Sequence, residues 1–216
     1  ARAFIGEKKA EEGLAFFRAA QSAAAAHGEG MLLQSQFKWD DASRAYELAG
    51  ARFAKLGNFP CEASALTAAG RARYSAGRYA EAEAHFRACY AIHEKRRDKL
   101  KMGEMLNNVA AIQGLRSEYA LALETHQRAL RLREEAGDKK GMATSLNNIA
   151  ALHGELGEKK RSREYFEKSL RLREELGDDA GVATCLQNIG MLHYQAAEYE
   201  RALEYFEQSR AKWEKL

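Results

Sequence analysis

Hydrophobic and small residues recur every forty positions along this chain of 216 residues. Leucine holds one position of four successive repeats and Gly or Ala follows four residues later, at Leu66, Leu106, Leu146 and Leu186 and at Gly70, Ala110, Ala150 and Gly190. A fixed period of this length is typical of stacked supersecondary units, each of which contacts mainly its neighbours. The pattern predicts a repeat protein with a long surface, which suits binding better than catalysis.

Each period contains two amphipathic helices. Leu106, Val109, Ala110 and Gln113 follow the i, i+3, i+4, i+7 spacing of one helix face, and a second such face begins at Tyr119. Between periods, pairs such as Gly137-Asp138 favour a helix end followed by an N-cap. The small residues let paired helices approach closely, and aromatic residues are expected to fill the remaining space, at Phe86, Phe166 and Phe206. The predicted fold class is all-α, an α-solenoid of stacked antiparallel helix pairs.

Composition narrows the class of partner. The formal net charge of +3 does not call for a nucleic acid, and no apolar run approaches the roughly 20 residues of a membrane span. The chain begins Ala1-Arg2-Ala3, so we expect a fragment or a processed chain. Three cysteines, Cys61, Cys89 and Cys185, are widely spaced and odd in number, which favours buried or bystander thiols in a reducing, cytoplasmic compartment.

No catalytic or metal-binding pattern stands out. The sequence contains no GxxxxGK[ST], GxGxxG or HExxH pattern, and its many carboxylates follow helix-surface and capping positions. His153 and His193 share one repeat position, but packed helices lie about 8–10 Å apart whereas zinc needs ligands within about 2.1 Å. We therefore expect packing histidines, no cofactor and no enzyme activity.

The repeat resembles the tetratricopeptide repeat. Asn108, Asn148 and Asn188 match the Asn at position 6 of that family's pattern, and Tyr79, Tyr119 and Tyr199 match its aromatic residue at position 17. The resemblance covers about residues 39–216 and implies a right-handed superhelix. Position 11 departs from the family pattern, holding Arg73, Gln113, His153 and His193.

Each repeat is six residues longer than the usual thirty-four of this family, and this length points to particular groups within it. The segments 128–138 and 168–178 are similar to repeats of kinesin light chains and of adaptors of the partner-of-inscuteable type. Both groups use a concave groove to hold an extended peptide. The resemblance implies an adaptor or scaffold that binds an extended peptide or a helix of a partner protein.

The first sixty residues diverge from the later repeats. Helices are expected to begin near Glu11 and at Phe37 to Ala42, and the stretch resembles soluble NSF attachment proteins of the gamma form, which implies a vesicle-fusion adaptor as one alternative. Gly28 to Gln36 fits the register poorly and predicts a longer loop. We expect a divergent helical part over 1–60, followed over 61–216 by about four helix pairs of the same continuous solenoid.

Carried over from the family, the groove strip comprises positions 5, 6 and 12 of the first helices, at Asn107, Asn147 and Gln187, at Asn108, Asn148 and Asn188, and at Tyr74 and Tyr194. A carboxamide has both a donor and an acceptor, so a row of them can pair with a peptide backbone. Gly114 and Gly154 would leave space for ligand side chains. The alternative for the position-6 residues is a structural bond to backbone in the neighbouring helix.

Two further surfaces are candidates for contacts. A basic run forms either a solvated turn or an edge for an acidic partner or an anionic membrane surface, at Lys95, Arg96, Arg97, Lys99 and Lys101. The last helix, Glu198 to Leu216, exposes one face and is expected to fray first or to pair with a second copy of the chain. A structural scaffold packed side-on in a larger assembly is the other alternative function.

Overall fold

The computed structural model describes Glu11, Leu14 and residues 22–216, and its regular elements in this part of the chain are all α-helices. It divides into two compact units, unit 1 (Ala1–Asp98) and unit 2 (Lys99–Leu216), each of which is described by itself. The helix expected to begin near Glu11 falls mostly outside the described residues. The predicted boundary near residue 60 and the continuity of the solenoid across both units stay predictions.

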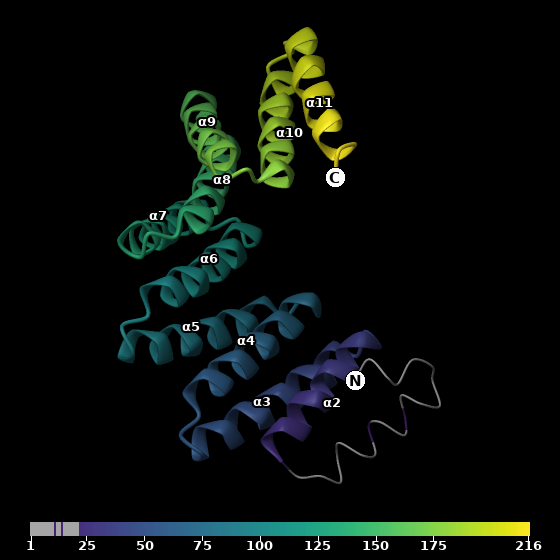
Figure 1. Ribbon diagram of the computed structural model, residues 1–216, viewed down its shortest axis with the longest axis vertical. Helices are drawn as coiled ribbons and strands as arrows, with labels where there is room; N and C mark the ends of the chain where they lie inside the picture. Colours follow the sequence, from purple (N-terminus) through teal and green to yellow (C-terminus); the bar gives the residue numbers. More distant parts are fainter. Residues whose placement is uncertain (1–10, 12–13, 15–21) are drawn as a thin grey trace. The chain divides into compact units, whose positions relative to one another are not determined.

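Unit 1 contains four described helices in which each packs on the one before it (Figure 1), α2 (Ala23–Ser35), α3 (Trp39–Lys55), α4 (Phe59–Ser75) and α5 (Tyr79–Lys95). Its core joins Leu32 and Leu33 of α2 to Tyr46 of α3 and Ala69 of α4. Ala-rich faces keep these helices close, because alanine adds little bulk at the contact.

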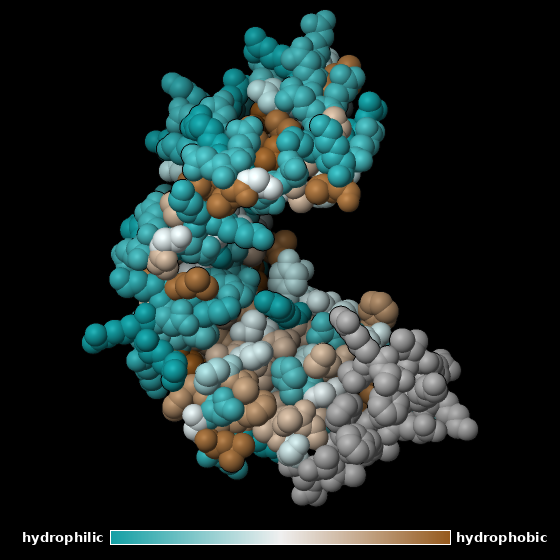
Figure 2. Space-filling model, viewed as in Figure 1, coloured by the Kyte–Doolittle hydropathy of each residue, from teal (hydrophilic) through white to brown (hydrophobic). Residues whose placement is uncertain are grey.

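Unit 2 contains three antiparallel helix pairs, α6 (Lys99–Leu115) with α7 (Tyr119–Glu135), α8 (Lys139–Glu155) with α9 (Lys159–Glu175), and α10 (Asp179–Gln195) with α11 (Tyr199–Trp213). The first helices also contact one another, α6 with α8 and α8 with α10. In Figure 2 hydrophilic residues cover most of the visible face of unit 2, and hydrophobic residues show between its helices. None of the described helices has the length and apolarity that a membrane crossing needs.

The turns explain the regular helix spacing. Gly137 and Gly177 adopt φ values of 68° and 64°, the left-handed conformation that ends a helix, as the sequence predicts. The next residue then caps the following helix: Asp138 accepts from the Gly141 amide at 2.9 Å and Asp178 from the Gly181 amide at 3.0 Å. Arg97 keeps the same conformation, with φ 56°, without being glycine.

Small residues at the helix crossings confirm the predicted close packing. A Cβ on Gly70 would lie 2.9 Å from the Phe86 ring, and one on Gly190 would lie 2.8 Å from the Phe206 ring. Cys89 fills a small-residue slot, where its thiol donates to the Ala63 carbonyl at 3.5 Å. The structure thus gives this thiol a packing role, and no disulfide joins Cys61, Cys89 or Cys185 in the described part of the chain.

The loop predicted over Gly28 to Gln36 is wrong, because helix α2 runs from Ala23 to Ser35. The Ser22 hydroxyl caps this helix by accepting from the Ala25 amide at 3.0 Å. Glycine occurs within the helix for packing, since a Cβ on Gly30 would lie 2.7 Å from the Tyr46 ring. The helix-and-turn spacing of the repeats therefore extends into the divergent part of the chain.

Candidate interaction surface

A ladder of carboxamides links the first helices of unit 2. Asn148 Nδ2 donates to Asn107 Oδ1 at 3.2 Å, and Asn188 Nδ2 donates to Asn147 Oδ1 at 3.0 Å. Each bond joins position 6 of one repeat to position 5 of the repeat before it, across α6, α8 and α10. The alternative expected from sequence, a structural bond from position 6 to backbone in the neighbouring helix, is right for Asn148 and Asn188 in the bond between helices and wrong in its acceptor, which is a side chain.

The ladder leaves hydrogen-bonding groups unused. The side chain of each asparagine in the ladder offers two amide protons and two carbonyl lone pairs. One ladder bond uses a single proton of the donor and a single lone pair of the acceptor. Donor capacity remains on Asn107 and Asn147, and acceptor capacity remains on Asn148 and Asn188. All four residues are partly exposed, so both kinds of group reach the surface of unit 2.

The other predicted strip residues lie at different depths. Gln187 is exposed and Asn108 is partly buried. Tyr194 is 55% exposed, and its ring meets the Tyr199 ring edge-on at 5.5 Å. Tyr74 belongs to α4 of unit 1, where its ring makes the same kind of contact with Tyr79 at 5.6 Å. The structure therefore brings the carboxamides of α6, α8 and α10 together within one unit, while Tyr74 is a feature of the other unit.

Gly114 and Gly154 are half-buried glycines on the first helices of unit 2. A Cβ on Gly114 would meet Leu152 at 3.6 Å, and one on Gly154 would meet Ser162 at 3.4 Å. These are ordinary contact distances, so internal packing leaves room for alanine at both positions. The space that glycine leaves there stays a predicted place for ligand side chains.

Position 11 forms a buried layer of unit 2. His153 is 3% exposed, stacks on Tyr165 at 5.3 Å and shares a hydrogen bond with Glu158 at 2.6 Å. His193 repeats this arrangement with Tyr205 and with Glu198. Hydrogen bonding by His153 is the largest influence that lowers the pKa of Glu158 below its usual range. No group of three or more metal-ligating side chains occurs among the described residues, and both rings pack as the sequence predicts.

A buried arginine contact links the pairs of unit 2 and was missed from sequence. Arg133, at the end of α7, is 6% exposed, and it donates to the Gly141 carbonyl at 2.6 Å and to the Ser145 hydroxyl at 2.9 Å. One repeat later, Arg173 pairs with Asp178 at 2.8 Å. The available signal was the repeated spacing of Arg, Asp and Gly, at 133, 138 and 141 and again at 173, 178 and 181.

The predicted basic edge is divided between the units. Lys95, Arg96 and Arg97 belong to unit 1, at the end of α5 and in the turn after it. Lys99 and Lys101 belong to α6 of unit 2, where Lys99 pairs with Glu135 at 3.0 Å and Lys101 with Glu104 at 2.8 Å. The two lysines of unit 2 are thus neutralised by internal partners.

Family models decide the identity of the repeats. A model described as "Tetratricopeptide repeat" matches residues 101–175 and 142–215, and another of the same description matches residues 63–96. The chain belongs to the tetratricopeptide repeat family. Helix pairs of forty-residue period, with small residues at their crossings, are this chain's version of the family architecture.

Solved structures of the same fold share little sequence with this tetratricopeptide repeat protein. BtubC (BKLC) from P. vanneervenii aligns with a TM-score of 0.78 at 16% identity, over 95% of this chain and 88% of that one. Nearly identical TPR-like repeats from Podosopora anserina, described as of a kinesin light chain, align with a TM-score of 0.69 at 16% identity, over 89% of this chain and 95% of theirs.

A Rap protein complexed with competence and sporulation factor aligns with a TM-score of 0.72 at 16% identity, over 89% of this chain but only 55% of that one. This chain thus spans little more than half of that protein. At such identities these likenesses show the fold alone. A comparison with curated proteins found no match.

Proposed function

We propose that this protein is an interaction adaptor whose unit 2 binds an extended segment of a partner protein along α6, α8 and α10. The observation that carries the proposal is the carboxamide ladder from Asn107 to Asn188. Ordered carboxamides lose little side-chain freedom on binding, which lowers the entropic cost of ordering an interface. The ladder is therefore suited to recognise backbone, with specificity left to neighbouring pockets.

The spacing of the first helices matches an extended ligand. Neighbouring packed helices lie about 8–10 Å apart, and an extended chain advances about 3.3 Å per residue. Each step from one first helix to the next then corresponds to about three ligand residues. A segment of six to nine residues would span α6, α8 and α10.

The comparisons support this proposal at the level of fold. The Rap structure holds a bound factor on a scaffold similar to this chain, which makes a binding role reasonable for unit 2. The likeness carries no residue roles, because the identity is 16%. Cytoplasmic location and pairing of the last helix with a second copy are parts of the same proposal that rest on sequence.

A double substitution tests the ladder. Random displayed peptides selected on the wild-type chain would supply ligands, which are then measured against Asn107→Leu/Asn147→Leu. Leucine keeps the branched shape of asparagine but cannot hydrogen-bond, so we expect affinity to fall at least tenfold with helicity unchanged. Gln127→Leu/Gln208→Leu, which changes two carboxamides on second helices, is the matched control and should bind normally.

Two outcomes would redirect the assignment. Equal affinity for the ladder variant and the wild type would overturn the placement of the site. Ligands sensitive only to substitutions on the second helices would favour the side-on scaffold. The fusion-adaptor alternative has its own test, which is salt-sensitive binding of the purified chain to assembled SNARE bundles.

A further inference from the structure

An ion pair closes the same edge of every helix pair in unit 2. This edge joins the first residue of the first helix to the last turn of the second helix. The three ion pairs are Lys99 with Glu135 at 3.0 Å, Lys139 with Glu175 at 3.7 Å, and Asp179 with Lys212 at 2.6 Å. A charged side chain from each helix thus covers the end of the crossing.

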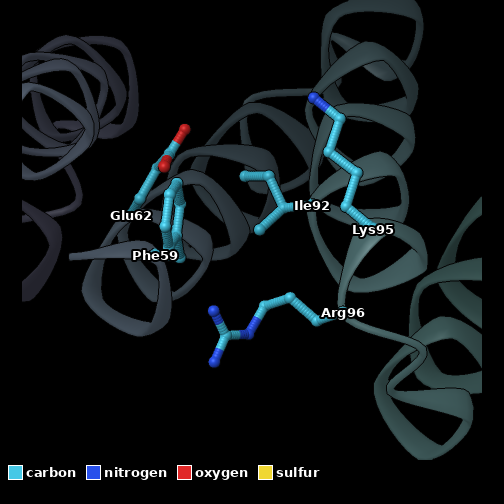
Figure 3. A pocket seen from close by; sticks show the side chains of 5 residues that line it. All are labelled: Phe59, Glu62, Ile92, Lys95 and Arg96. Carbon is cyan, nitrogen blue, oxygen red and sulfur yellow. The ribbon is translucent and has the colours of Figure 1, made fainter. Parts of the chain in front are cut away.

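The pair α4–α5 of unit 1 is built differently at this edge. Phe59 begins α4 at the position of Lys99 and Lys139, and Lys95 ends α5 at the position of Glu135 and Glu175. Because the Phe59 ring carries no charge, it cannot form with Lys95 the ion pair that closes the corresponding edges of unit 2. The edge instead opens into a pocket of about 300 Å³ (Figure 3), lined by Phe59, Glu62, Ile92, Lys95 and Arg96.

The pocket combines an apolar floor with basic groups at its rim. Figure 3 shows Ile92 beside the Phe59 ring, the Arg96 guanidinium below it and Glu62 next to it, while the Lys95 ammonium lies beyond Ile92 and points away from the ring. The Arg96 guanidinium lies 5.7 Å from the ring centroid, a cation–π distance that orients it. Phe59 is 47% exposed, so part of its aromatic ring stays accessible beside the Arg96 guanidinium.

The charges around this pocket are unbalanced. Within the described part of the chain, Lys95, Arg96 and Arg97 form no ion pair, whereas the corresponding residues at the end of α7 and in the turn after it are Glu135, Ala136 and Gly137. Glu62 is the one carboxylate among the residues that line the pocket, and in the described structure it forms no ion pair with Lys95 or Arg96. The edge therefore offers positive charge beside exposed apolar surface, which fits an acidic ligand with an apolar side chain.

We propose that this edge pocket binds a partner-protein segment in which one large apolar side chain is flanked by Asp or Glu. The apolar side chain would contact Phe59 and Ile92, and the flanking carboxylates would approach Lys95 and Arg96. The volume lies at the lower end of the roughly 300–1,000 Å³ of ligand pockets, which suits a single anchoring side chain. Three adjacent cations fall short of the about four to eight that mark anionic lipid recognition.

The edge pocket is a second surface, distinct from the carboxamide ladder, because all its lining residues belong to unit 1. A direct test uses a fluorescent acidic heptapeptide with a central phenylalanine, and the same peptide with glycine at the centre. Fluorescence polarisation should show at least tenfold weaker binding of the glycine peptide. Raising the salt concentration should weaken both, since the contact is partly electrostatic.

A variant can close the pocket without removing the fold. Phe59→Lys/Lys95→Glu rebuilds at this edge the ion pair that α6–α7 and α8–α9 carry, so we expect an unchanged or higher melting temperature and at least tenfold weaker binding of the phenylalanine peptide. Lys139→Glu/Glu175→Lys, which reverses an ion pair at the matching edge of α8–α9, should bind the peptide as the wild type does.

Three results with the peptides would overturn the edge pocket, and a fourth concerns lipid vesicles. The three are equal binding of the two peptides, unchanged binding by Phe59→Lys/Lys95→Glu, and loss of binding in Asn107→Leu/Asn147→Leu, which would assign the peptide to the ladder. Binding of phosphatidylserine vesicles without binding of the peptide would also overturn it in favour of a membrane surface. These variants differ from those that test the ladder. The two proposals are therefore tested independently, and failure of one does not decide the other.

Discussion

His126 is a buried histidine at a repeat position that otherwise holds phenylalanine, at Phe86, Phe166 and Phe206. His126 Nδ1 and Gln113 Oε1, which belong to the same helix pair, are both buried without a hydrogen-bond partner among the described residues. Burial, together with the Arg133 guanidinium, lowers the pKa of His126 to about 4 from 6.5. The pair α6–α7 therefore holds two buried polar atoms that lack a hydrogen-bond partner among the described residues.

The sign of the pH effect follows from this shift. Unfolded His126 takes up a proton below about pH 6.5, whereas the folded state stays neutral until about pH 4. The free energy of unfolding should thus fall as the pH drops from about 6.5 to 4, by up to about 3 kcal/mol from this residue.

The substitution His126→Phe tests both statements. Phenylalanine at this position faces Ala110, as Phe166 faces Ala150, so we expect it to fit and to raise stability by about 1–2 kcal/mol at pH 7.5. The gain should grow at pH 5, because the variant lacks the titrating group. Urea titrations at both pH values measure it, and a variant that keeps the wild-type pH slope would contradict the assignment to His126.

At the scale of the element, Arg133 holds α7 against the beginning of α8. Its guanidinium bonds to Gly141 and Ser145, and Asp138, which caps α8, lies 3.8 Å from Arg133 Nε. A Cβ on Gly141 would overlap the Asp138 carboxylate and lie 2.8 Å from Arg133 Cδ. Glycine at this position is thus a requirement of the contact between successive pairs.

Two glycine substitutions give opposite predictions. Gly141→Ala should lower the free energy of unfolding by about 2 kcal/mol or more, because it displaces a cap and a buried arginine. Gly114→Ala should raise it by about 0.5–1 kcal/mol, since alanine favours helix and its Cβ meets only Leu152, at 3.6 Å. Chemical denaturation measures both, and equal effects would contradict this account of Gly141.

Sequence reasoning succeeded where each repeat could be compared with the others. Gly137, Asp138 and the small residue opposite Phe86 hold their register, and local rules for turns, caps and packing predict their structure. The Asn148–Asn107 bond was not predicted, because side chains 41 residues apart meet only once the helices are stacked. The loop prediction near Gly30 failed for a related reason, because Gly30 makes room for the ring of Tyr46, a residue on the next helix.

The pocket in unit 1 could be predicted from sequence only in part. Comparing Phe59 with Lys99 and Lys139 in the shared register could have flagged this edge from sequence. The basic run was recognised, but its division into paired lysines on α6 and cations at the end of α5 and in the turn after it needed the contacts of each side chain. Position in the repeat predicts where a residue lies, and its neighbours decide what it can bind.

At the scale of the molecule, stability in unit 2 should follow the number of neighbouring helices. Helix α8 packs against α6, α7, α9 and α10, whereas the main partner of α11 is α10. Leu203 on α11 is 58% exposed. Because stability in stacked repeats is set largely by nearest-neighbour contacts, the least protected helix is the one with fewest of them.

Amide hydrogen exchange checks this gradient. We expect the slowest exchange in α8, intermediate rates in α7 and α9, and the fastest in α11. Pairing of α11 with a second copy would slow its exchange as protein concentration rises. Uniform protection across α6 to α11 at low concentration would contradict a stack held together by neighbouring pairs.

Nuclear magnetic resonance of the asparagine side-chain amides tests the central proposal, binding along the ladder, most directly. On titration with a selected extended peptide, the Nδ2 proton signals of Asn107 and Asn147 should shift in proportion to occupancy, while those of Gln127 and Gln208 stay in place. Saturable peptide binding that leaves the Asn107 and Asn147 signals unmoved would contradict the account.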